Sequence, residues 1–312
     1  MPDPARLLRA LIHPLRPRRE ASPTTDFLPG SESQGHVLWR LLSHSPQALF
    51  GVAVLALVAG TALTAGWWYP DDPLAMVAPP LLWPGEDPAF PLGSDSLGRD
   101  VAAGLVHGAK VSLTVGLVAA ILSLGIGLTV GGLGGFFGGA LDDALVRVTE
   151  LFQTVPSFLF VIVLVAIGKP SVTVIVTAIG LASWPVIARL VRAEFRSLRE
   201  TEFVLAARSL GYGPARLILR EILPNALPPV IVTTSVLVAT AILIESALSF
   251  LGMGDPNMVS WGSMIGDGRD QLRTAWFLTA LPGGAILLTV LALNLVGDAL
   301  NDRFNPRLRG LR

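Results

Sequence analysis

Residues 48–68 read ALFGVAVLALVAGTALTAGWW, a run without a charged side chain. A helix needs about 20 apolar residues to cross the hydrocarbon core of a bilayer, and this run is long enough. It ends at Trp67 and Trp68, followed by Tyr69, and such aromatic side chains favour the headgroup region. Pro70 and two aspartates then stop the helix. The stretch therefore predicts a transmembrane helix, and it sets the fold class.

Further apolar runs of comparable length follow along the chain, at residues 111–137, 148–167, 172–191, 226–251 and 276–296. We therefore expect an all-α integral membrane protein with six transmembrane helices within residues 48–301. Only 15% of the residues are charged, against roughly 25% in soluble domains. The chain has no cysteine, which excludes thiol catalysis, disulfides and thiolate metal sites.

The basic residues are distributed unevenly between alternate loops. Six spans would place 18 of the 23 basic residues on one face and five on the other. Those five are Arg99, Lys110, Lys169, Arg269 and Arg273. Because cytoplasmic loops are enriched in arginine and lysine, we expect both termini in the cytoplasm. This topology predicts a loosely ordered cytoplasmic leader (1–47), an external loop (70–110), a cytoplasmic loop (192–224) and a cytoplasmic tail (302–312).

Several kinds of chemistry have no residues to carry them. The only lysines, Lys110 and Lys169, lack the glycine spacing of a phosphate-binding P-loop. The four histidines form no metal-spaced pair, and no nucleophile elbow occurs. We therefore predict no catalytic residue, no cofactor and no metal site in this chain, and no nucleic-acid partner. Energy for uphill transport would have to come from a partner subunit or an ion gradient.

The loop at 192–224 is polar but patterned, and it predicts two short helices. Ser197 and Glu200 have the spacing of a capping box for the first helix. Gly211 would end that helix in a left-handed cap, Pro214 would begin the second, and Pro224 would close it. One face of the first helix carries Phe203, Ala206, Ala207 and Leu210. A bent helical pair of this kind suits docking on a partner, although a basic amphipathic surface could also bind anionic lipid.

At these residues the sequence resembles the coupling motif of ABC importer permeases. That motif reads Glu-Ala-Ala, three residues, Gly, nine residues, Ile, one residue, Leu-Pro. The triplet at 205–207, the glycine at 211 and the Leu-Pro pair at 223–224 keep this spacing, whereas Leu205 and Glu221 depart from it. The resemblance implies ATPase contacts at Glu202, Ala206, Ala207, Arg208, Leu210, Gly211, Leu223 and Pro224.

The resemblance extends from about residue 91 to 307 and is closest to the C-type permeases of dipeptide, oligopeptide and nickel importers. It rests on residues 91–95, 98–100, 206–225, 245–252, 261–262 and 294–298. It implies the type I ABC importer fold in a bacterial inner membrane. It also implies two cytoplasmic ATPase subunits that bind the ATP, an external solute-binding protein, and a second related permease that is usually a different chain. The transported solute would be a peptide or a similar small molecule.

Glu245 lies inside an apolar run, where a charge costs about 2.5–3.5 kcal/mol on insertion scales. We expect it to face protein or water, either as a pathway residue or as a hydrogen-bonded packing residue. Asn294 and Asp298 are possible polar partners, or residues that tie helices together. The alternative function is an ion-coupled transporter or channel that works without an ATPase and uses Glu245. A membrane scaffold whose loop binds a regulator is a further alternative.

Glycine spacing predicts a helix contact, and an aspartate in the external loop predicts a helix start. Glycines recur every fourth residue in the second run and predict a close helix contact. They are Gly127, Gly131, Gly135 and Gly139. In the external loop, residues 95–107 predict an interfacial helix capped by Asp95, with contact to the binding protein as the alternative role.

Overall fold

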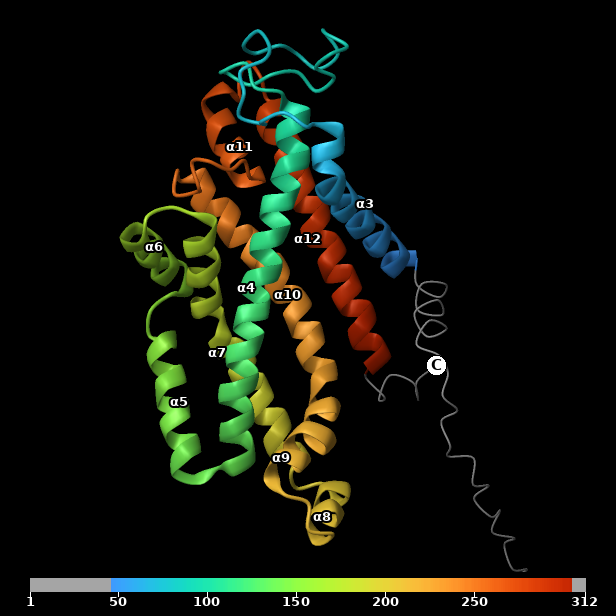
Figure 1. Cartoon of the computed structure of the whole chain (residues 1–312), viewed down its shortest axis with the longest axis vertical. Helices are drawn as coiled ribbons and strands as arrows, with labels where there is room; N and C mark the ends of the chain where they lie inside the picture. Colours follow the sequence, from blue (N-terminus) through green and yellow to red (C-terminus); the bar gives the residue numbers. More distant parts are fainter. Residues whose placement is uncertain (1–45, 305–312) are drawn as a thin grey trace, which may run out of the picture. The chain divides into compact units, whose positions relative to one another are not determined.

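The computed structural model describes residues 46–304, which form a bundle of helices without a strand (Figure 1). The all-α prediction is confirmed. In chain order the elements are α3 (Pro46–Trp68), α4 (Val101–Phe137), α5 (Gly139–Gln153), α6 (Ser157–Gly168), α7 (Val172–Leu198), α8 (Glu202–Ser209), α9 (Pro214–Arg216), the π-helical turn η1 (Leu217–Ile222), α10 (Leu223–Phe250), α11 (Trp261–Gly268), the 3-10 turn η2 (Arg269–Gln271) and α12 (Phe277–Phe304). Nearly all of the predicted leader (1–47) and most of the tail (302–312) lie outside the described residues.

Five helices are long and apolar enough to cross a membrane within residues 46–304, and a bent pair of helices makes a sixth candidate. The five are α3, α4, α7, the continuous helix Pro214–Phe250, and α12. The bent pair is α5 and α6, whose axes differ by 78°. The apolar run at 148–167, expected as one transmembrane helix, is thus divided between the two helices of this pair. Pro156 explains the break, because proline has no N–H to donate and disfavours a helical conformation in the preceding residue.

Helix α4 begins ten residues before the predicted span at 111–137. Residues 101–107 of the predicted interfacial helix are therefore part of α4. Its N-cap is Asp100, whose side chain accepts a hydrogen bond from the Ala102 N–H. The predicted cap, Asp95, instead closes a turn by accepting hydrogen bonds from the N–H groups of Leu97 and Arg99. Because no proline lies between Asp100 and Phe137, the helix continues unbroken from the external segment to Phe137.

Three of the four spaced glycines form the contact between α4 and α7, as predicted. A Cβ atom added to Gly131 would lie 2.3 Å from the carbonyl oxygen of Ala188, and one added to Gly127 would lie 2.6 Å from Ile187. At Gly135 the nearest atoms would be 2.7 Å away. The two backbones therefore approach as closely as glycine allows. Gly139 does not take part, because it follows the turn into α5 and has no neighbour within 4 Å of the Cβ position.

The boundaries around the polar loop differ from those expected. Helix α7 continues to Leu198, so Ser197 is an internal helical residue and the predicted capping box with Glu200 does not form. Pro224 does not close a helix either. The chain runs without interruption from α9 through η1 into α10, and Pro224 occupies the first turn of α10. At this point the backbone hydrogen bonds change from the i→i+5 pattern of a π turn to the i→i+4 pattern of an α-helix. The N–H that proline lacks is therefore not needed there.

The segment between α3 and α4 is held by tight backbone contacts. Gly93 and Gly98 both have a positive φ, and a Cβ atom on either would lie 2.2 Å from a carbonyl oxygen across the segment. The buried Ser94 hydroxyl accepts a hydrogen bond from the Leu82 N–H and donates one to the Pro79 carbonyl. This segment lies with α11 at one end of the bundle, and α8 lies at the opposite end (Figure 1).

Candidate functional site

Helix α8 is attached to the bundle through one face. Val204 and Ala207 are 0% and 7% exposed, and they belong to an apolar cluster with Phe195 of α7 and with Leu217 and Ile222 of η1. Their spacing of three residues places both side chains on the same face of the helix. The cluster continues into Phe136 at the end of α4 and into the first turns of α10. We call this cluster the inner core.

A neighbouring face of α8 presents apolar side chains to the surroundings. Phe203 and Leu210 are 43% and 76% exposed, and Ala206 lies between them on the exposed surface. Exposed apolar side chains that cluster on a short helix at one end of a protein are typical of an interaction surface. Of the predicted contact pair Ala206 and Ala207, only Ala206 can meet a partner, because Ala207 is buried in the inner core.

Gly211 ends α8 in the predicted left-handed cap. Its φ is +82°, and its N–H donates to the Arg208 carbonyl at 2.9 Å. The Tyr212 N–H donates to the Ala207 carbonyl at 3.2 Å, which completes a Schellman motif. Apart from its two chain neighbours, no residue within 46–304 has an atom within 4 Å of the position that a Cβ would take. The requirement for glycine is therefore conformational rather than steric.

The bend after Gly211 is fixed by one further contact and by a proline. The Arg208 side chain is exposed, whereas the Arg216 guanidinium lies over the Tyr212 ring, 3.7 Å from its centroid. A cation held against an aromatic face at this distance stabilises the bend. Pro214 begins α9, as predicted, where its missing N–H leaves no helical bond unmade.

The remaining residues of the coupling motif divide between the surface and the inner core. Glu202 is exposed in the first turn of α8, where a carboxylate is favoured by the helix dipole. Leu205, which stands where the motif has glutamate, is 41% exposed. Leu223 is partly buried against the inner core, and Pro224 is exposed. The motif therefore combines residues that face outward with residues that anchor the segment.

Glu245 is buried in α10 and is surrounded by serine hydroxyls. It is 2% exposed, and its carboxyl group accepts hydrogen bonds from Ser249 at 2.7 Å, Ser112 of α4 at 3.3 Å and Ser246 at 3.5 Å. The Ser112 hydroxyl also accepts a hydrogen bond from the Trp261 N–H of α11 at 3.4 Å. The carboxyl group thus links α4, α10 and α11, which is the arrangement expected of a hydrogen-bonded packing residue.

Asn294 and Asp298 do not join this cluster. The Asn294 amide donates to the Val290 carbonyl of its own helix at 3.0 Å, and Asp298 is exposed. Within residues 46–304, no hydrogen bond connects either side chain with Glu245. The three predicted polar residues therefore occupy separate places.

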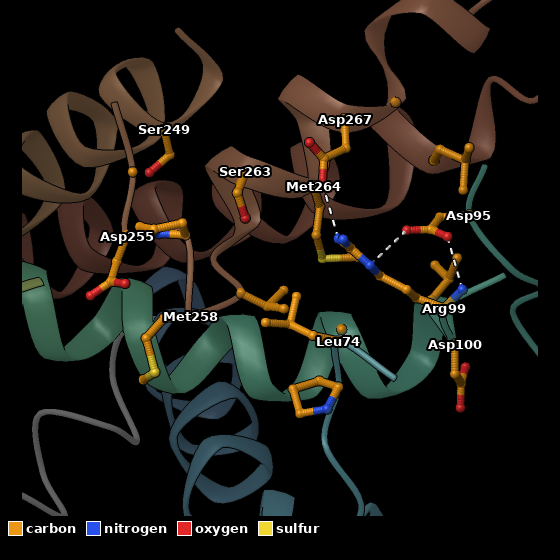
Figure 2. A pocket seen from close by; sticks show the side chains of 18 of the residues that line it. Leu74, Asp95, Arg99, Asp100, Ser249, Asp255, Met258, Ser263, Met264 and Asp267 are labelled. Atoms are coloured by element: carbon orange, nitrogen blue, oxygen red, sulfur yellow. Dashed lines mark hydrogen bonds and ion pairs between the residues drawn. The ribbon is translucent and has the colours of Figure 1, made fainter. Parts of the chain in front are cut away.

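A cavity of about 280 Å³ lies at the end of the bundle opposite α8, between the start of α4, the loop before α11 and α11 itself (Figure 2). Arg99 lies between two carboxylates on its wall, 3.4 Å from Asp267 and 3.8 Å from Asp95. Burial, the largest cause, raises the pKa of the Asp267 carboxyl above its ordinary value. Arg99 opposes this shift, whereas Asp95 adds to it.

One charged contact was not predicted from the sequence. Asp142 of α5 is 6% exposed and accepts two hydrogen bonds from Arg192 of α7, at 2.5 Å from Nε and 2.7 Å from Nη2. In the sequence, Arg192 is only one of the 18 basic residues that six spans would place on the same face. The available signal was an aspartate pair, Asp142 and Asp143, next to an apolar run, but its partner lies 50 residues away in the sequence.

Comparisons with known proteins agree with the motifs. Residues 98–310 match the family described as "Binding-protein-dependent transport system inner membrane component". The chain is 37% identical to the di/tripeptide transport system permease protein DppC of Pseudomonas aeruginosa, over 87% of this chain and 91% of that protein. It is 34% identical to the dipeptide transport system permease protein DppC of Haemophilus influenzae, over 87% of this chain and 94% of that protein.

The fold is also similar to that of a solved transporter. A chain of the MetNI methionine ABC transporter in an inward-facing conformation superimposes with a TM-score of 0.53 and 18% identity, covering 65% of this chain and 96% of that one. At this identity the likeness concerns the fold alone. In this family the ATP is bound by partner subunits, and the permease itself is not an enzyme. Family membership therefore argues against the alternative function, a transporter or channel that works without an ATPase. The chain belongs to the family of binding-protein-dependent transport system inner membrane components, the permease subunits of ABC transporters.

Proposed function

We propose that this chain is the C-type permease subunit of a bacterial inner-membrane importer for peptides or similar small solutes, and that α8 is its docking element for a cytoplasmic ATPase. The observation that carries the proposal is the two-faced packing of α8. Val204 and Ala207 fix it to the inner core, whereas Phe203, Ala206 and Leu210 remain exposed. A short helix with a free apolar face can enter a groove of a partner.

The same proposal assigns a role to the cap at Gly211. The Schellman motif and the Arg216–Tyr212 contact fix the direction in which the chain leaves α8. Because the chain then enters α10 without a break, a displacement of α8 would move a membrane-spanning helix directly. Alternating access, driven by closure of an ATPase dimer, would use this connection. Glu202 and Arg208 are exposed and would supply polar contacts at the edge of the docking surface.

The proposed topology has six spans, with α5 and α6 together forming the third, and both termini in the cytoplasm. Its support is the asymmetry of basic residues, because the loop that contains α8 carries several arginines. The outer cavity beside Arg99 would then face the side on which the binding protein acts. The domain limits that follow are the leader, the membrane domain at 48–301 with its external and coupling loops, and the tail.

The substrate class and the second permease rest on the relatives. Two curated relatives are named for dipeptide or di/tripeptide transport, and each is covered over more than nine tenths of its length. A peptide is therefore the solute that we propose. We further propose that the second permease is a different, related chain, as the C-type resemblance implies. Coexpression with candidate partners, followed by purification of the complex, tests this pairing.

The docking proposal is tested by Gly211→Val in the complete transporter, reconstituted with its ATPases and loaded binding protein. A β-branched residue is strongly disfavoured at a positive φ, so the cap should distort. We expect labelled dipeptide uptake per ATP hydrolysed to fall, with normal membrane insertion. Gly213→Val is the matched control, because Gly213 has a φ of −70° and no neighbour near its Cβ position. Equal uptake by both variants would contradict the docking role.

A second experiment tests the dependence on a partner. The purified permeases alone, placed in vesicles under a proton or sodium gradient, should show no dipeptide uptake, and uptake should appear when ATPase, ATP and binding protein are added. Gradient-driven uptake without the ATPase would refute the proposed function.

A further inference from the structure

A charged contact ties α5 to α7 close to α8. The Asp142 carboxylate is bound by Arg192 through two parallel hydrogen bonds of 2.5 and 2.7 Å, and the Arg196 guanidinium lies 3.9 Å from the same group. Such bidentate pairs are strong and fix the relative orientation of their partners. The carboxylate also lies against Gly134, where an added Cβ would be 3.0 Å from Oδ1. The carboxylate is therefore in close contact with the α4 backbone as well.

The end of α7 also holds the end of α4. The Arg199 guanidinium donates to the carbonyls of Gly135 and Phe136, at 3.3 and 3.2 Å. The last carbonyls of a helix have no partner within the helix and carry partial negative charge, so a guanidinium stabilises them. Together with the glycine contact described above, this makes the inner halves of α4 and α7 a single rigid pair.

By contrast, α5 has few other attachments, chiefly the Phe152 ring, whose centroid lies 5.2 Å from that of the Trp184 ring of α7. Asp142 and Thr149 are its only buried side chains. A cavity of about 250 Å³ separates part of α5 from α4 and α7, with Leu145, Val146 and Ala188 among its lining residues. Elements that move in a working protein are expected to have few buried contacts. Asp142 is thus the charged attachment of α5 to the rigid pair, and Phe152 against Trp184 is the apolar one.

This attachment lies next to the element that we assign to the ATPase. Val191 and Phe195, which flank Arg192 along α7, belong to the inner core together with Val204 and Ala207 of α8. A displacement of α8 must therefore shift the segment of α7 that carries Arg192. On the other side, α5 leads through the break at Pro156 into α6. The contact connects the docking helix with the broken span.

We propose that Asp142 and Arg192 form the joint through which movement of α8 reaches the broken span α5–α6. They are positioning residues, and their role is to make α5 follow the α4–α7 pair when the ATPases close. The inference rests on the proposed function of α8. It goes beyond that function because it identifies the residues that carry motion from the docking site into the membrane domain.

The test uses Asp142→Asn and Arg192→Lys in the complete transporter in proteoliposomes, with uptake and ATP hydrolysis measured together. Both changes keep the size of the side chain but lose the bidentate pair. We expect ATP hydrolysis stimulated by loaded binding protein to persist, and dipeptide transported per ATP to fall about tenfold, within the usual range of coupling between sites. Asp143→Asn and Arg189→Lys are the matched controls, because both residues are exposed neighbours on the same helices.

A double variant separates a joint from two independent effects. If the residues act through each other, Asp142→Asn combined with Arg192→Lys should transport as much per ATP as the worse single variant. Effects that multiply would overturn the proposal, as would wild-type stoichiometry in both single variants. Failure of both variants to assemble would assign the pair a purely structural role and would also overturn it. A wild-type complex without ATP-dependent uptake would refute the proposed function itself, which distinguishes the two failures.

Discussion

The close contact between α4 and α7 makes a quantitative prediction for Gly131→Ala. The new methyl group would lie 2.3 Å from the Ala188 carbonyl oxygen and 2.9 Å from Val191 Cβ. The oxygen belongs to a helical backbone and cannot turn away, so the two helices would have to separate by about 1 Å to restore an ordinary contact distance. Overpacking of this kind costs about 1–3 kcal/mol.

Gly125→Ala is the control that isolates this cost. Gly125 lies in the same helix, and in the described part of the chain no other segment comes within 4 Å of its Cβ position. Both variants share the helix-propensity gain of about 1 kcal/mol for alanine over glycine. Their difference therefore measures the clash alone. For a difference of about 2 kcal/mol, the melting temperatures of the two variants should differ by about 4–8 °C, if the scaling for soluble domains of 150–250 residues holds.

The measurement is thermal unfolding in detergent, followed by the fluorescence of the seven tryptophans. Gly125→Ala should melt at or above the wild-type temperature, and Gly131→Ala clearly below it. A Gly131→Ala protein that melts as high as Gly125→Ala would refute the close approach of α4 and α7 on which the rigid pair depends.

Three further predictions follow from other contacts. Glu245→Ala should lower the melting temperature strongly, because buried serine hydroxyls lose their acceptor, and each unsatisfied hydroxyl costs about 1–3 kcal/mol of stability. Glu245→Gln should lower the melting temperature less, because the amide oxygen can still accept a hydrogen bond. Gly262→Ala should loosen α11 from α10, since its Cβ would lie 2.5 Å from Ser246 Cα, and protease protection of α11 would report this loss. Asp267 has a folded-state pKa above its unfolded value, so its ionisation opposes folding once the pH rises above the unfolded pKa. Asp267→Asn should therefore stabilise the protein at neutral pH but not at strongly acid pH. The lost contact with Arg99 reduces this gain in stability. Melting temperatures measured across this pH range would show whether the variant is more stable than the wild type.

Features set by local chemistry could be predicted from the sequence. Apolar runs of sufficient length identified the long helices, because bilayer thickness sets their minimum length. The left-handed cap at Gly211 and the helix start at Pro214 were also predicted correctly. Each depends on the conformational range of one residue, and that range does not change with the surroundings. The glycine spacing likewise predicted one face of α4, although not its partner α7.

Features set by contacts between distant segments could not be predicted. Pro156 was visible inside the third run, but the sequence did not show that the chain would bend by 78° instead of kinking slightly. Pro224 was expected to end a helix, and the π turn before it accommodates the proline instead. The partner of Asp142 lies on another helix, 50 residues away, and Ser112, one of the partners of Glu245, lies 133 residues away on α4. Sequence spacing gives no information about such pairs.

Helix α7 is attached to α4 and to α5 in two different ways. The difference determines which movements the protein can make. The glycine contact between α4 and α7 is made by backbone atoms at the closest possible distance, so any sliding of one helix past the other meets steric resistance at several turns. The contact between α7 and α5 is made by side chains beside a cavity, namely the charged pair Asp142–Arg192 and the ring pair Phe152–Trp184. Side chains can rotate while a bidentate pair stays intact, which permits a hinge but not a separation. A rigid pair joined to a broken span by such a hinge can change the angle of that span without loss of its attachment, which is the kind of motion that alternating access requires.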